Sequence, residues 1–106
     1  MAGLLLALWG APAAYGHAAF LGSDPQPGVR LQIAPAQVTL SFTEPLNRTL
    51  AGAKITRVGG GVIATRMAAS QRRLVLRPME QLKRGAYRVR WHSVSTQDGH
   101  ALEGSF

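Results

Sequence analysis

Three residues near the two ends of this 106-residue chain have side chains that bind metal ions: His17, Asp98 and His100. The first sixteen residues contain a short apolar run and end in small residues at the −3 and −1 positions of a signal-peptidase site. Cleavage after Gly16 would make His17 the first residue. Its α-amine and a ring nitrogen could then chelate one metal ion. We therefore predict a signal peptide over residues 1–16 and an exported domain over residues 17–106, located in the periplasm or another extracytoplasmic space.

The chelate depends on where cleavage occurs. The leader has no Lys or Arg before its apolar run, which departs from the usual pattern. Cleavage before Ala14 would place the α-amine three residues ahead of His17 and remove the chelate. At the other end, the chain stops at Phe106, within a predicted strand, so we expect a truncated final strand.

Asp98 and His100 are separated by one glycine. In an extended strand, residues two apart point to the same face, which would bring the carboxylate and the imidazole together. A turn at Gly99 would make this convergence less certain. A polar loop, with Asp98 capping a turn and His100 exposed, is the alternative interpretation of this segment taken alone.

The α-amine, the two imidazoles and the Asp98 carboxylate would form a nitrogen-rich set of four donors. Among the divalent first-row metals, copper(II) binds such nitrogen and oxygen ligands most tightly, whereas calcium prefers oxygen ligands. The chain has no cysteine, which argues against structural zinc and a thiolate copper(I) site.

The net charge of +7 comes from 12 basic and 5 acidic residues. The basic residues are spread from Arg30 to Arg90 and do not alternate with aromatic residues, so we expect no nucleic-acid binding. A solvated basic surface is the preferred interpretation, and attraction to a membrane surface is the alternative. The apolar runs are shorter than a membrane-spanning helix needs.

Short strands separated by turns are expected throughout the exported domain. Residues 38–42 and 87–91 alternate apolar and polar side chains, the period of a half-buried strand. Gly59-Gly60-Gly61 is typical of a hairpin turn, and Met79–Leu82 is the one stretch that could form a helical turn. The pattern predicts an all-β protein, a sandwich or small Greek-key barrel of about seven antiparallel strands.

Seven short segments together cover nearly all of residues 17–106: His17-Ala18, Ser23-Asp24-Pro25 with Gly28, Val38 to Leu46, Gly52-Ala53, Gly85 to Trp91, Val94 to His100, and Gly104-Ser105-Phe106. In these segments the chain resembles the CopC family of periplasmic copper-binding proteins. The V-S-x-x-D-G-H segment, together with the amino-terminal histidine, is the most specific part of this resemblance.

The resemblance implies a cupredoxin-like fold and one copper(II) ion in a histidine-brace site formed by His17, Asp98 and His100. Glu44 matches an acidic residue near that site and is expected to orient the amine or His17. The resemblance further implies a copper carrier or buffer in copper homeostasis or resistance, without a small-molecule substrate and monomeric. Its expected partner is a CopD-type membrane copper transporter, either separate or fused to the same chain.

The expected positions of four other residues follow from the same patterns. Met67 and Met79 are isolated, so we expect them to fill the core and expect no dedicated copper(I) site. Some members of the family have a methionine-rich loop that binds copper(I), and this sequence has no such loop. His92 falls on the polar face of its strand and is expected at the surface, while Trp91 is expected in the core.

Two other functions remain open at this point. A histidine brace also activates oxygen in polysaccharide monooxygenases, but this chain has few aromatic residues for a sugar-binding surface, and we expect no enzyme. A metal-free structural domain with a basic surface is the other alternative. It predicts that replacing His17, Asp98 or His100 changes nothing.

Overall fold

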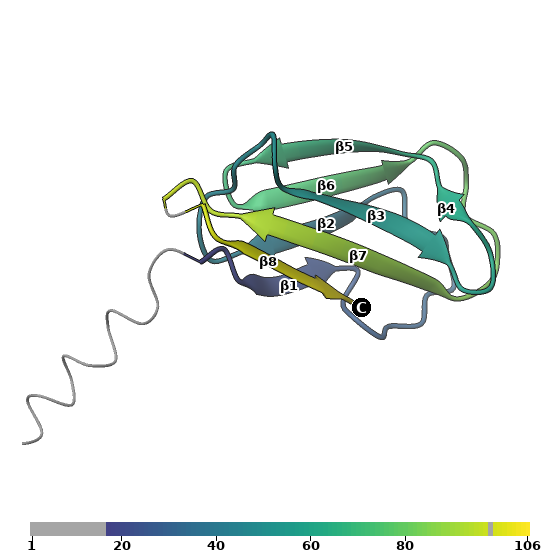
Figure 1. Ribbon diagram of the computed structural model, residues 1–106. Coiled ribbons are helices and arrows are strands. Elements are labelled where there is room, and N and C mark those ends of the chain that lie inside the picture. The colour runs from purple at the N-terminus through teal and green to yellow at the C-terminus, as the bar shows by residue number, and fades with distance from the viewer. Residues whose placement is uncertain (1–16, 98) are drawn as a thin grey trace, which may run out of the picture.

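Two antiparallel sheets pack face to face in the computed structural model, which describes residues 17–97 and 99–106. The described residues form eight strands (Figure 1): β1 (Phe20–Asp24), β2 (Val38–Phe42), β3 (Gly52–Arg57), β4 (Val62–Ile63), β5 (Thr65–Ser70), β6 (Arg73–Pro78), β7 (Tyr87–Val94) and β8 (Ala101–Ser105). The expected all-β sandwich is confirmed, with one strand more than predicted. The predicted signal peptide lies outside the described residues.

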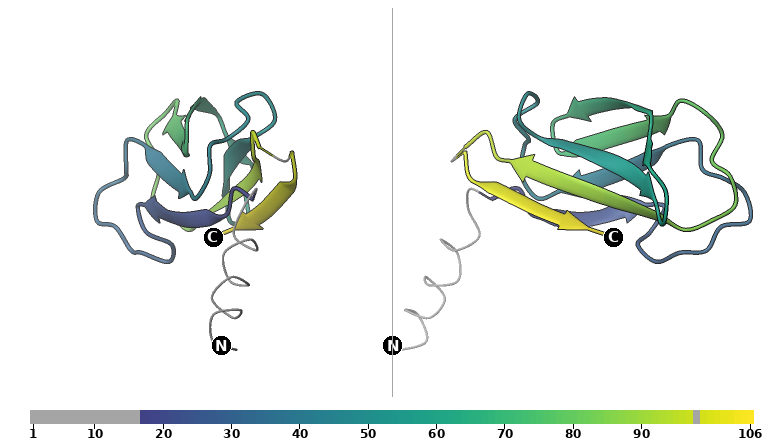
Figure 2. Two further views of the ribbon diagram at one scale, coloured as in Figure 1. Left: turned by 90° about the vertical axis from the view of Figure 1, so that its left-hand side faces the viewer. Right: turned by 45° about the vertical axis from the view of Figure 1, so that its right-hand side comes forward.

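The strand order is β1-β2-β6-β5 in one sheet and β4-β3-β7-β8 in the other. Figure 2 shows the two sheets facing each other from two further directions. In each sheet a central strand pairs with one strand that is distant in sequence, β2 with β6 and β7 with β3, as in a Greek key. Residues far apart along the chain therefore meet at the ends of the sandwich.

The alternating strands supply the core. In β2 the side chains of Val38, Leu40 and Phe42 are buried, with half-buried polar residues between them. From β7, the Trp91 ring packs against the same core, stacked on Phe20 at 5.5 Å and edge-on to Phe42 at 5.3 Å between ring centroids. Burial of these aromatic and aliphatic surfaces is the main stabilising contribution to the sandwich. The core position expected for Trp91 is confirmed.

The two methionines are not core residues, and that prediction is wrong. Met67 is 42% exposed and Met79 is 60% exposed. Met67 lies on β5, an edge strand whose side chains are largely exposed, and Met79 follows the end of β6. Neither position is covered by both sheets, so an apolar side chain there remains accessible to solvent.

The turns agree in part with the predictions. Gly59-Gly60-Gly61 forms the β3–β4 hairpin turn, with Gly59 at φ 77° and the Gly60 N–H donating to the Arg57 carbonyl at 2.8 Å. The helical turn considered for Met79–Leu82 is not formed, because that stretch bends away after Pro78. Among the described residues, no helix has the length and apolar character needed to cross a membrane.

Candidate metal centre

The imidazoles of His17 and His100 lie side by side at one end of the sandwich. Their ring centroids are 5.0 Å apart, and the ring planes differ by 22°. His17 is half-buried and His100 is exposed. The rings are stacked, and the lone pair of an imidazole nitrogen lies in its ring plane, so binding one ion at the ~2 Å distance of metal–imidazole bonds requires the side chains to rotate. The structure nevertheless brings together the two histidines that the sequence analysis selected.

The backbone that carries His17 is held by two strands. Thr43, which follows β2, accepts a hydrogen bond from the Ala19 N–H and donates one to the His17 carbonyl, both 3.0 Å long. The Ser93 hydroxyl on β7 donates to the Ala18 carbonyl at 2.5 Å, and Ser93 is fully buried. Because these bonds involve three successive residues, the backbone from His17 to Ala19 has a defined position.

His100 is placed by the loop between β7 and β8. The buried Ser95 accepts hydrogen bonds from two loop amides: its hydroxyl oxygen from Gln97 and its carbonyl from Gly99, each 3.1 Å long. Gly99 has a φ of 70°, a left-handed conformation that glycine adopts without a steric penalty. The loop is thus a turn at Gly99 and not the extended strand considered above, and His100 immediately precedes β8.

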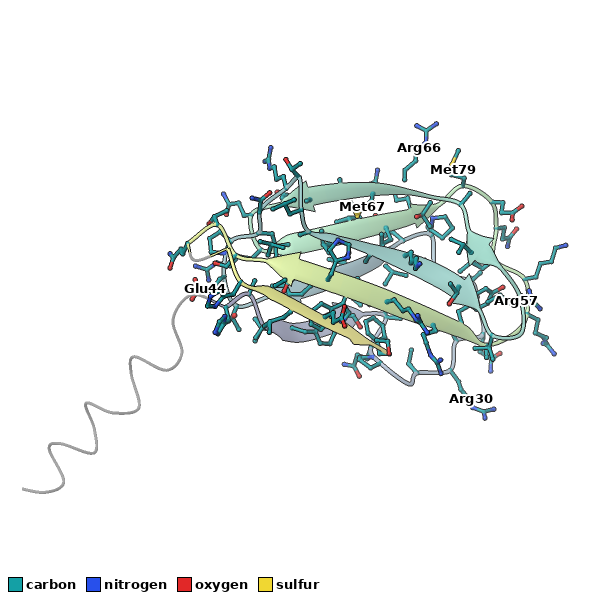
Figure 3. The ribbon with its side chains drawn as sticks, in the orientation of Figure 1. Arg30, Glu44, Arg57, Arg66, Met67 and Met79 are labelled. Atoms are coloured by element: carbon teal, nitrogen blue, oxygen red, sulfur yellow. The ribbon has the colours of Figure 1, made fainter. Side chains whose placement is uncertain are left out.

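Of the two acidic residues of the predicted site, the structure describes only Glu44. Asp98 lies outside the described residues, so its place in the ligand set stays a prediction. Glu44 is half-buried, directly follows Thr43, and lies at the end of the sandwich that carries the β7–β8 turn (Figure 3). Within residues 17–97 and 99–106, no three His, Cys, Asp or Glu side chains gather closely enough to hold a metal ion.

His92 does not join this centre. It lies on the outer face of β7, paired with Gly52 of β3 on one side and Glu103 of β8 on the other. Its exposed position is confirmed. The neighbouring Ser93 points inward, because successive side chains of a strand point to opposite faces of the sheet.

The supporting residues Thr43, Ser93 and Ser95 were not selected from the sequence. For Ser93 a signal was present, since it continues the inward-facing series of Tyr87, Val89 and Trp91 with a polar side chain. A buried hydroxyl in an apolar row needs a hydrogen-bond partner, and here that partner is the Ala18 carbonyl. Thr43 and Ser95 had no comparable signal, because each lies outside the alternating strands.

Comparison with known proteins identifies the family. The family model described as "CopC domain" matches residues 20–106. Protein YobA of Escherichia coli strain K12 is 33% identical over 99 residues, covering 90% of this chain and 79% of YobA. Copper resistance protein C of Xanthomonas campestris pv. juglandis is 33% identical over 101 residues, covering 87% of this chain and 78% of that protein. The crystal structure of PcoC, a methionine-rich copper resistance protein from Escherichia coli, superposes with a TM-score of 0.77 at 30% identity, covering 85% of this chain and 94% of PcoC.

Proposed function

The chain belongs to the CopC family, whose members are periplasmic copper-binding resistance proteins and not enzymes, and on this premise we propose that it carries one copper(II) ion at its amino-terminal end. The observation that carries the proposal is the pair of adjacent imidazoles of His17 and His100, with ring centroids 5.0 Å apart. Two imidazoles supply half of the tetragonal N,O set that copper(II) prefers.

The remaining donors are proposed from the sequence. Export followed by cleavage after Gly16 would give His17 a free α-amine, and Asp98 would add a carboxylate oxygen. The fixed backbone from His17 to Ala19 supports this assignment, because an amine on an ordered segment loses little conformational freedom on binding. For Glu44, next to Thr43, we propose that its carboxylate orients the amine or the His17 ring through a hydrogen bond.

The proposed role is transport or buffering of copper without chemistry on it. A site at the end of a rigid sandwich, with the exposed His100 on its outer side, is accessible to a partner that takes over the ion. We infer a CopD-type membrane copper transporter as that partner, either as a separate protein or as a further part of the same chain. In this view the domain acts as a monomer that presents copper to the transporter.

The test compares two forms of the protein in a copper(II) titration. One begins at His17 and the other carries one extra glycine before it, and binding is followed by Trp91 fluorescence and electron paramagnetic resonance. We expect one tight copper(II) ion and quenching in the first form, and binding at least 100-fold weaker in the second. Equal affinities would exclude the amine as a ligand and overturn the proposed brace.

His100→Ala and His92→Ala provide a matched pair of histidine removals. The first removes a proposed ligand, and the second removes an exposed histidine outside the centre. Only His100→Ala should change the copper(II) spectrum. Loss of the spectrum in both variants would indicate binding at scattered surface histidines.

A further inference from the structure

A second pair of metal-binding side chains meets on the outer face of the sandwich, above Gly52. A Cβ atom built at Gly52 would lie 3.0 Å from Cε1 and 3.2 Å from Nε2 of His92. The same point is 3.7 Å from the Cε methyl of Met67. An imidazole nitrogen and the end of a thioether side chain are therefore both within 4 Å of one position that glycine leaves vacant.

The two side chains come from different sheets. His92 is on β7 and covers Gly52, its partner on β3. Met67 is on β5, the edge strand of the other sheet, and β3 contacts β5 across that edge. Figure 3 shows Met67 between β5 and β3. The pair is therefore created by closure of the sandwich, and neither residue belongs to the His17–His100 centre.

From this geometry we infer a second metal site, formed by Nε2 of His92 and Sδ of Met67, that takes a soft monovalent cation such as copper(I). Thioether sulfur selects copper(I) over harder ions, and imidazole is an effective copper ligand. Both side chains are exposed, so the ion has direct access from solvent.

The charges around the pair disfavour a divalent ion more than a monovalent one. Lys54, Arg90 and Glu103 line the same groove as His92 and Met67, so the lining carries one more positive than negative charge. Because Coulomb repulsion scales with the charge of the ion, a divalent ion meets about twice the penalty of a monovalent one. Among the described residues that line the groove, Glu103, paired with His92 across the ladder, is the one acidic group that offsets this charge.

Gly52 is integral to the site. A side chain at this position would require the His92 ring to shift by a few tenths of an ångström, because its Cε1 atom lies 3.0 Å from the built Cβ. An aromatic ring over a strand glycine also has a structural value, since it shields the exposed backbone. That role needs the ring but no nitrogen, and it needs no contribution from Met67. The two roles therefore predict different behaviour for variants of each residue.

This inference differs from the expectation that the chain has no copper(I) site, which assumed that both methionines were buried. The inference does not rest on the proposed copper(II) function, because the two sites share no residue.

Silver(I), a diamagnetic ion with the same preference for soft ligands, is the probe for this site. It is added to protein with ¹³C-labelled methionine methyl groups, and binding is followed by NMR.

We expect the Met67 methyl and the His92 Cε1–H signals to shift together and to saturate at one equivalent of silver(I). The Met79 methyl is the internal control, since it is more exposed than Met67 and lies outside the groove. Met67→Leu and His92→Phe should each weaken silver(I) binding at this site at least tenfold, while Met79→Leu leaves it unchanged. His92→Phe keeps a ring over Gly52, so the fold is retained.

Copper(I) affinity, measured anaerobically against a chromophoric chelator, should decrease in the same two variants. Copper(II) binding at His17 should be the same in all of them, so failure of one site is distinguishable from failure of the other. Equal shifts of both methionine methyls, or full silver(I) binding in Met67→Leu, would overturn the inference.

Discussion

Ser93 of β7 donates a 2.5 Å hydrogen bond to the carbonyl of Ala18, although 75 positions separate the two residues in sequence. Both are fully buried. The bond ties the residue that follows His17 to the strand that leads into the loop of His100. The sandwich therefore helps to fix the backbone that carries both imidazoles.

Ser93→Ala should destabilise the domain and weaken copper(II) binding together. The variant leaves the buried Ala18 carbonyl without this donor, at a cost of about 1–3 kcal/mol in the free energy of unfolding. Chemical denaturation measures the first effect and a copper(II) competition assay the second. Ser105→Ala is the matched control, because that exposed serine is on the neighbouring strand. Unchanged copper(II) affinity in a destabilised Ser93→Ala variant would show that Ala18 does not position the site.

Thr43 offers a sharper test of the same idea. Its hydroxyl accepts from Ala19 and donates to His17, so Thr43→Val removes both bonds and keeps the shape of the side chain. We expect a three- to tenfold loss of copper(II) affinity, measured by competition, because the His17 backbone is then less ordered before binding. Thr43→Ser retains the hydroxyl and should retain the affinity. If Thr43→Val binds copper(II) as tightly as the native protein, preorganisation of His17 has no role.

The strands of the core were predictable because burial imposes a period of two. β2 and β7 each pack one face on the interior, so their sequences alternate. β5 was missed because Thr65–Ser70 is an edge strand with largely exposed side chains. Its sequence therefore lacks the alternation of apolar and polar residues that a buried face imposes. The exposure of Met67 follows from the same edge position. It could not be deduced from spacing along the chain.

The two histidines of the candidate centre lie side by side, and their proximity is a property of the topology. His17 precedes β1 at the edge of one sheet, and His100 precedes β8 at the edge of the other. Only the packing of the two sheets brings these edges together, and no local pattern encodes that contact. Ser93 is the intermediate case, because its polarity in an apolar row indicated a partner without identifying it.

Trp91 should report copper(II) binding without belonging to the site. It is the single tryptophan of the predicted mature domain, and its ring is stacked on Phe20 of β1, near the segment that carries His17. We expect fluorescence quenching that saturates at one equivalent of copper(II) and that is lost in His100→Ala. Phe20→Leu removes the stacked ring and should change the emission of the metal-free protein, while the saturation point stays the same. Quenching that continues linearly beyond one equivalent would instead indicate collisions with unbound copper.

Gly104→Ala should be among the more damaging single substitutions in β8. A Cβ there would lie 2.6 Å from Cζ2 of Trp91 and 2.9 Å from Cε2, closer than packed atoms allow. The indole cannot retreat easily, because Phe20 and Phe42 hold it from two directions. Overpacking of this kind costs about 1–3 kcal/mol, so the midpoint of urea denaturation should fall clearly.

Gly22→Ala provides the comparison, since Gly22 is also in a strand and a Cβ there meets nothing within 4 Å. That variant should be neutral or stabilised by up to about 1 kcal/mol, because alanine restricts the unfolded chain. The difference between the two variants isolates the contact with Trp91 from the general effect of replacing glycine. Equal stability of the two variants would mean that the indole is free to move, and Trp91 would then be a poor fixed reporter for the copper site.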